Sequence, residues 1–171
     1  VARFRQGDTN AAAQAFLEAA VLGETEEGPY MALNALQDLA SIQIRQGRLA
    51  QIKKTCERAM RLATRWGGAR LPAAGMAHID FGGVLYEQNE LAEAAQSLTL
   101  GIDLLRGSTE QYLLEEGYTI LARVKQACGD PEGALAVIVQ GEAWFNQARI
   151  ADVDSIALLA LGQARLWLLQ G

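Results

Sequence analysis

A turn-forming residue recurs along this chain at nearly constant intervals. The residues are Gly7, Gly47, Asn89, Gly129 and Gly171, and their sequence numbers differ by 40, 42, 40 and 42. Glycine and asparagine adopt, more readily than other residues, the left-handed backbone conformation that ends many helices. Each of them except the last is followed by polar residues and then by a helical pattern, so we expect each to mark a tight turn between antiparallel helices.

Positions at fixed distances from these turns carry side chains of similar size. Small residues stand seven before or twelve after the turns: Ala40, Gly82, Ala122, Ala164, Ala19, Ala59, Gly101 and Gly141. Apolar residues stand nine positions after the turns, at Phe16, Cys56, Leu98 and Ile138, and five positions after them, at Ala12, Ile52, Ala94 and Ala134. We expect the small residues to lie where paired helices approach most closely. One pair cannot bury its own apolar faces, so the pairs should stack into an array.

The composition favours helices. The 171 residues include 30 Ala and 24 Leu but only 3 Pro, and Val, Ile and Thr number 7, 9 and 7. Such a balance predicts an all-α fold with little material for a sheet. We expect one repeat domain over residues 1–171, as a fragment of a larger protein. Helix pairs are predicted at about 1–22, 30–66, 73–106 and 110–147, with an unpaired helix at 153–170.

The predicted last helix is unusually apolar. From Ile156 to Leu169, every residue except Gly162, Gln163 and Arg165 is apolar. This segment is too short to span a membrane, and Gln163 and Arg165 interrupt it. A helix that caps an array needs a polar outer face. We therefore expect the fragment to cover this face by self-association or by folding back, and we expect no contact with a membrane.

Two segments resemble a known repeat domain. Residues 71–106 contain Leu85-Tyr86-Glu87 before a turn and Leu91 and Ala94-Ala95 after it, and residues 115–137 contain Leu121-Ala122-Arg123 before Gly129-Asp130. These segments resemble the tetratricopeptide-like (TPR) domain of the large ATP-dependent LuxR-type, or MalT-like, transcription activators. The repeat is longer than the ordinary TPR unit and close to HEAT repeats in length, but its turn is of the TPR kind.

The resemblance implies a fold and a role. The fold is a right-handed α-solenoid of antiparallel helix hairpins. The role is that of the signal-sensing module of a bacterial, cytoplasmic transcription regulator, placed between a nucleotide-binding switch and a helix-turn-helix. Its partners would be an inducer or a protein, together with the adjacent domains of the parent chain. The alternative is a freestanding scaffold for protein–protein interaction that is unrelated to transcription.

The residues do not suggest catalysis. The chain has no G-x-x-x-x-G-K-[ST] loop, so we expect no cofactor here, and the resemblance implies that the parent protein binds ATP elsewhere. His78 is the only histidine; it is read as a structural residue or, alternatively, as a groove contact. Cys56 and Cys128 have no neighbouring histidine to activate them and are read as small apolar residues. We expect neither an enzyme nor a metal site.

Charge is distributed unevenly. The net charge of −5 argues against direct contact with nucleic acid. Nevertheless, eight of the 15 Lys and Arg lie in residues 45–70, where Glu57 is the only acid. Helical spacing places four of them on one face: Lys54, Arg58, Arg61 and Arg65. This stripe is either a solvated convex face or a docking surface for an acidic partner, such as the switch domain of the same polypeptide.

The first helix of each pair should line a concave groove. Its expected lining combines polar and large side chains, namely Asn34, Gln37, Ser41, Met76, Tyr86, Glu116, Thr119, Arg123 and Gln126. Such a lining could hold a small polar molecule or an extended peptide. We prefer Tyr86 and Arg123 as anchors, because aromatic residues and arginine contribute most binding energy per side chain. The alternative is that these are ordinary groove residues without a ligand.

Overall fold

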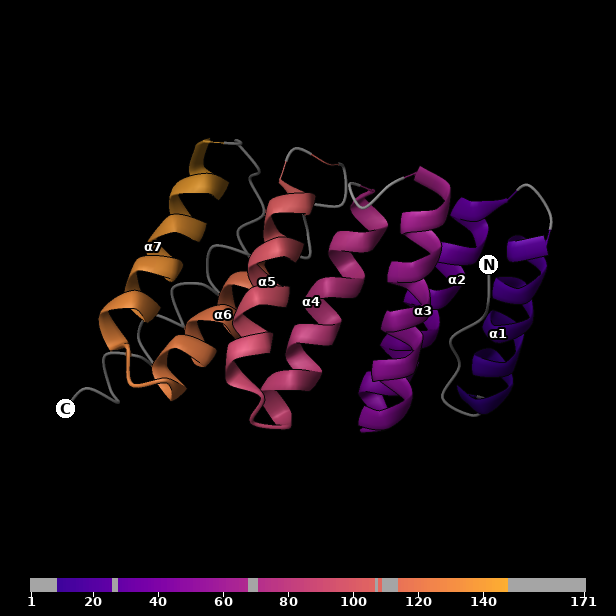
Figure 1. Ribbon diagram of the computed structural model, residues 1–171, viewed down its shortest axis with the longest axis horizontal. Coiled ribbons are helices and arrows are strands. Elements are labelled where there is room, and N and C mark those ends of the chain that lie inside the picture. Colours follow the sequence, from indigo (N-terminus) through magenta and orange to yellow (C-terminus); the bar gives the residue numbers. More distant parts are fainter. Residues whose placement is uncertain (1–8, 26–27, 68–70, 107, 109–113, 148–171) are drawn as a thin grey trace. The chain divides into compact units, whose positions relative to one another are not determined.

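A computed structural model describes residues 9–25, 28–67, 71–106, 108 and 114–147 (Figure 1). These residues form seven α-helices and no strand, which confirms the all-α fold class. In chain order the helices are α1 (Thr9–Thr25), α2 (Pro29–Arg45), α3 (Leu49–Gly67), α4 (Pro72–Glu87), α5 (Leu91–Leu105), α6 (Leu114–Ala127) and α7 (Pro131–Gln147). The expected helical segments at 1–6 and 153–170, with Gly7, Ala164 and Gly171, lie outside the described residues.

The three predicted turns within the described part of the chain are confirmed. Gly47, Asn89 and Gly129 have φ angles of 66°, 61° and 77°, in the left-handed region. Each turn closes with the same hydrogen bond, donated by the residue after the turn to a carbonyl five positions earlier. The bonds are Arg48 N to Gln43 O, Glu90 N to Leu85 O and Asp130 N to Lys125 O, at 3.0, 2.9 and 3.0 Å. This is the Schellman geometry that ends a helix and reverses the chain.

Proline marks the first residue of three helices. Pro29, Pro72 and Pro131 are the first residues of α2, α4 and α7. A proline at the first helical position removes a donor that has no partner within the helix and holds φ at a helical value. The structure places all three prolines of the chain at such positions.

The chain forms two compact units, residues 1–81 and 82–171. In the first unit α2 packs against both α1 and α3, and its Leu33, Leu36 and Ile42 are almost fully buried. In the second unit α6 packs against both α5 and α7, where Tyr118 and Phe145 are the largest buried side chains. Within each unit, helices that are consecutive along the chain therefore pack as antiparallel neighbours, as the repeat predicted. A right-handed stacking of all the pairs remains a prediction.

The small repeat positions lie at close helix contacts. Ala40, Ala59, Gly82, Ala122, Gly101 and Gly141 are all buried. A Cβ atom at Gly82 would lie 2.5 Å from Cγ of Leu98 and 3.3 Å from the carbonyl oxygen of Ala94, both on α5. Cys56, Leu98 and Ile138 fill the adjoining space at 1%, 0% and 1% exposure. Among the described repeats, packing at these positions is looser in the first, where Ala12, Phe16 and Ala19 are half-buried.

Asp130 caps the start of α7. Its Oδ1 accepts a hydrogen bond from the Gly133 backbone N–H at 2.8 Å, and its Oδ2 accepts one from Lys125 Nζ at 3.3 Å. A side chain at Gly133 would collide with this carboxylate. The hydrogen bond from Gly133, followed by the Lys125 contact, holds the pKa of Asp130 below its ordinary value of 3.8.

Among the described helices, none combines the length and the apolar character that crossing a bilayer requires. The expected apolar helix at 153–170 lies outside the described residues, so its self-association remains a prediction.

Substitutions at two neighbouring glycines of α4 can measure how much a methyl group destabilises the close contact between α4 and α5. Gly82→Ala and Gly83→Ala gain the same helix propensity, about 1 kcal/mol. Overpacking applies only to Gly82, because a Cβ at Gly83 would meet Ile120 Cδ1 at an ordinary 3.5 Å. We expect urea unfolding to show Gly82→Ala less stable than Gly83→Ala by about 1–3 kcal/mol. Equal stabilities would contradict close approach at Gly82.

Because of the Asp130 cap, the free energy of unfolding should depend on pH in the acid range. Because its pKa is lower in the folded chain, its stabilising contribution is present above the unfolded value of 3.8 and is lost as pH falls through the folded value. Asp130→Asn keeps an acceptor but lacks the charge. The stability difference between wild type and Asp130→Asn should therefore shrink in urea titrations between about pH 6 and pH 3. Glu132→Gln, which removes an exposed acid in the same turn, is the control. If the stability difference between wild type and Asp130→Asn did not change with pH, the electrostatic role of the cap would be refuted.

Candidate functional site

Four of the predicted groove residues share one face of α6. Glu116, Thr119, Arg123 and Gln126 follow intervals of three, four and three positions, which places them on one side of a helix. We call this surface, together with Tyr86 at the end of α4, the α6 face. All five residues belong to the second compact unit.

The structure brings the two preferred anchors into contact. The guanidinium carbon of Arg123 lies 4.7 Å from the centroid of the Tyr86 ring, within the range of a cation–π interaction. Arg123 Nη2 is also 4.0 Å from Glu87 Oε1, and both of these side chains are substantially exposed. An ion pair this long and this exposed contributes little to stability. Arg123 thus keeps N–H donors that can bind an oxygen acceptor.

The remaining residues of the α6 face differ in their surroundings. The Thr119 hydroxyl oxygen is buried and has no hydrogen-bond partner among the described residues. Desolvation raises the pKa of the Glu116 carboxyl above its ordinary value of 4.5, although the residue as a whole is exposed. Gln126 is half-buried. The face therefore offers a cation, an aromatic ring and polar groups within one surface.

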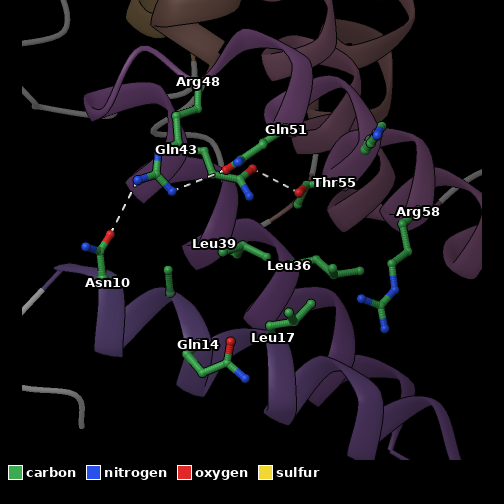
Figure 2. A pocket seen from close by; sticks show the side chains of 12 residues that line it. Asn10, Gln14, Leu17, Leu36, Leu39, Gln43, Arg48, Gln51, Thr55 and Arg58 are labelled. Carbon is green, nitrogen blue, oxygen red and sulfur yellow. Dashed lines mark hydrogen bonds between the residues drawn. The ribbon is translucent and has the colours of Figure 1, made fainter.

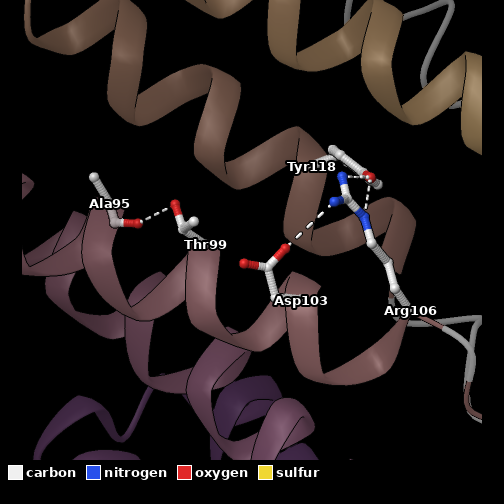
Figure 3. Close-up of polar contacts among 5 residues, drawn as sticks. All are labelled: Ala95, Thr99, Asp103, Arg106 and Tyr118. Atoms are coloured by element: carbon white, nitrogen blue, oxygen red, sulfur yellow. Dashed lines mark hydrogen bonds and ion pairs between the residues drawn. The ribbon is translucent and has the colours of Figure 1, made fainter.

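Two part-buried hydrogen bonds join Arg106, at the end of α5, to Tyr118 of α6 (Figure 3). Tyr118 is completely buried, and its hydroxyl accepts hydrogen bonds from Arg106 Nε at 3.0 Å and from Arg106 Nη2 at 2.5 Å. Arg106 Nη1 lies 3.3 Å from Asp103 Oδ1. The end of α5 is thereby tied to α6. The sequence analysis missed this cluster, because nothing in the repeat pattern pairs Arg106 with Tyr118.

The predicted groove residues of the first unit differ in their exposure and their contacts. Gln37 Nε2 donates to Asp80 Oδ2 at 3.2 Å, and Asp80 is a buried carboxylate that the sequence analysis did not single out. Met76 is only 5% exposed, so it presents little area to a ligand. Asn34 is exposed and Ser41 is half-buried.

Cys56 and His78 have surroundings typical of structural residues, whereas Cys128 is exposed. Cys56 is 1% exposed, and its burial strongly raises the pKa of the thiol, so the reactive thiolate does not form near neutral pH. Burial lowers the pKa of His78 below its ordinary value of 6.5. In the described part of the chain, no three His, Cys, Asp or Glu side chains gather closely enough to hold a metal ion.

The predicted basic stripe borders a groove between helices (Figure 2). The groove has a volume of about 500 Å³, with walls from α1 and α3 and a floor from α2, and Lys54 and Arg58 line it. We call it the α1–α3 groove. Arg58 Nε lies 2.7 Å from Glu24 Oε1 of α1. Arg61 and Arg65 line an adjoining hollow with Glu24 and Arg58. The sequence located the basic stripe, but it did not reveal that α1 lies beside it.

Comparison with known proteins identifies the family. The family described as MalT-like TPR region matches residues 1–171. This chain belongs to the MalT-like TPR family. A search of curated proteins finds no match to it. The MalT-like TPR region occurs in regulators of the MalT/LuxR type, and TPR regions are typically non-catalytic and mediate protein interactions. The resemblance inferred from the two sequence segments is thus confirmed over the whole chain.

The contact between Tyr86 and Arg123 in this MalT-like TPR region can be measured by a double-mutant cycle. We expect Tyr86→Leu and Arg123→Met to couple by about 0.5–1 kcal/mol in urea unfolding, as a partly exposed cation–π pair should. Tyr86→Leu combined with Lys125→Met is the control, because Lys125 contacts Asp130 instead. Coupling of equal size in both cycles would contradict a specific contact.

Proposed function

We propose that this MalT-like TPR region is the ligand- or partner-sensing interaction module of a bacterial LuxR/MalT-type regulator. The observation that carries the proposal is the Arg123 guanidinium over the Tyr86 ring, on a family scaffold that binds other molecules rather than catalysing reactions. Tyr86 and Arg123 come from different helices, so a ligand that contacts both would bridge α4 and α6.

The chemistry of the α6 face indicates the class of ligand. Arg123 offers a planar set of N–H donors that suits a carboxylate or other paired oxygen atoms. Tyr86 offers an aromatic surface beside the Arg123 guanidinium. A small polar molecule with oxygen acceptors, or an extended peptide with an acidic side chain, would satisfy these groups together.

Signalling through such a site requires two arrangements of the helices. A ligand shifts an equilibrium only as far as its affinities for the two states differ. A molecule that bridges α4 and α6 favours the arrangement in which both anchors reach it. Because Arg106 and Tyr118 tie α6 to α5, a change at α6 would be transmitted to α5, and from there toward the adjacent domains of the parent chain.

A thermal-shift screen of metabolites and candidate partners on the intact parent protein tests the proposal. A true ligand at about 100 times its Kd should stabilise the protein by about 2.7 kcal/mol. Arg123→Ala should weaken binding at least about tenfold, which removes about 1.4 kcal/mol of binding free energy. Tyr86→Leu should act in the same direction.

Arg45→Ala is the charge-matched control, because it removes an exposed arginine at the end of α2. A ligand whose stabilising effect survives both Tyr86→Leu and Arg123→Ala would refute the α6 face as the sensing site.

A further inference from the structure

We propose that the α1–α3 groove is a docking site for an acidic amphipathic helix of a partner protein or domain. The groove belongs to the first compact unit, and the proposal is independent of the ligand at the α6 face. Its support comes from the floor, the rim and an ion pair that the lining residue Arg58 makes at the edge of the groove.

The floor of the groove is apolar. Leu36 and Leu39 of α2 form it, and Leu17 of α1 faces them from one wall (Figure 2). Leu17 is 39% exposed, and Val21, one turn further along α1, is 48% exposed. Leu36 and Leu39 are already buried, so apolar side chains of a partner would remove from water chiefly the surface of Leu17 and Val21.

The rim of the groove is cationic. Arg48, Lys54 and Arg58 are among its lining residues, and no Asp or Glu is. The chain as a whole carries a net charge of −5, so this positive region stands out against an acidic background. Charge complementarity therefore selects an acidic partner and disfavours a basic one.

An ion pair within the chain already shows how the rim binds a carboxylate. Glu24 Oε1 of α1 lies 2.7 Å from Arg58 Nε, while the side chains of both residues keep about 30% of their exposure. Lys54 is exposed and makes no ion pair within the described part of the chain. A carboxylate of the partner can therefore pair with Lys54 directly, and with Arg58 in competition with Glu24.

The walls favour a helix over an extended peptide. Both walls are α-helices, whose backbone groups bond within their own helix and leave no free edge for strand pairing. A helical partner satisfies its own backbone and presents leucines at intervals of three and four positions to the floor. From Asn10 to Leu17 the α1 wall extends about 10 Å, which is the length of roughly two turns of a partner helix.

The comparable groove of the second unit lacks this charge pattern. It has a volume of about 490 Å³ and is lined by residues of α5 and α6, including the exposed Leu100. Its two charged residues are Asp103 and Lys125, which pair with Arg106 and Asp130. Because this groove carries no excess positive charge, it serves as an internal control.

Fluorescence anisotropy with a designed peptide tests the proposal on the full chain. The probe is a fluorescein-labelled helical peptide of about four turns, long enough to cover the α1 wall, with leucines at intervals of three and four positions and glutamates elsewhere. The counterpart has lysine in place of every glutamate. We expect saturable binding of the acidic peptide and none of the basic one.

Matched variants separate the groove from general electrostatics. Lys54→Glu should weaken binding of the acidic peptide about tenfold or more, while Arg61→Glu, two turns along the same helix and outside the groove, should change it less than about threefold. Glu24→Gln should strengthen binding by freeing Arg58, and Glu18→Gln should not, although both remove one negative charge from α1. Leu17→Ala should weaken binding more than Leu100→Ala.

Several outcomes would overturn the proposal. One is the lack of saturable binding by the acidic peptide, with the variants' folding checked by circular dichroism. Another is an equal effect of Lys54→Glu and Arg61→Glu, which would indicate unspecific attraction. A third is binding of a short single-stranded DNA with the same dependence on Lys54, which would assign the groove to nucleic acid.

Discussion

The close contact of paired helices at small residues is the constraint on which the rest of this structure depends. At Gly82, Leu98 and the Ala94 carbonyl leave no room for a Cβ atom, and Ala40, Ala59, Ala122, Gly101 and Gly141 are likewise buried. Such contacts require that the chain reverse within a few residues. The left-handed residues at Gly47, Asn89 and Gly129 provide this reversal, and the Schellman hydrogen bonds satisfy carbonyls at the helix ends. The turns and the small residues therefore act together: the turns reverse the chain, and the small residues let the paired helices pack closely.

Three arginines differ in how exposed their partner side chains are, and this difference separates fixed contacts from exchangeable ones. Arg106 donates two hydrogen bonds to the hydroxyl of a fully buried tyrosine and serves to join α5 to α6. Arg123 lies on the partly exposed Tyr86 ring and keeps donors for a ligand. Arg58 is intermediate, since its partner Glu24 is itself accessible and can be displaced. A buried partner fixes an arginine because separating the two would leave a polar group without hydrogen bonds, whereas a hydrated partner exchanges readily.

The repeat gives the chain two kinds of surface. First helices of the pairs, such as α6, present a face on which residues at intervals of three and four positions combine an arginine with polar side chains. Second helices, such as α1 and α3, border grooves whose floors come from the helix between them. The packing positions constrain neither surface, so each can change its side chains without disturbing the array. The proposed ligand site and the proposed docking site can therefore change their side chains while the fold stays the same.

The sequence by itself determined the turns, the buried small positions, the helical class, the family and the α6 face. All of these depend on intervals within a helix or across a tight turn, which the helical period and the turn geometry fix. Only the tertiary structure decided that Arg58 meets Glu24, that Gln37 binds Asp80 and that Arg106 holds Tyr118. The tertiary structure also decided that Met76 is buried. It placed α1 beside α3, so that Lys54 and Arg58 of the basic stripe line one side of a groove. These pairings depend on the axial register and rotation of neighbouring helices, which the connecting loops and the packing of many side chains set together, and no local interval in the sequence encodes them.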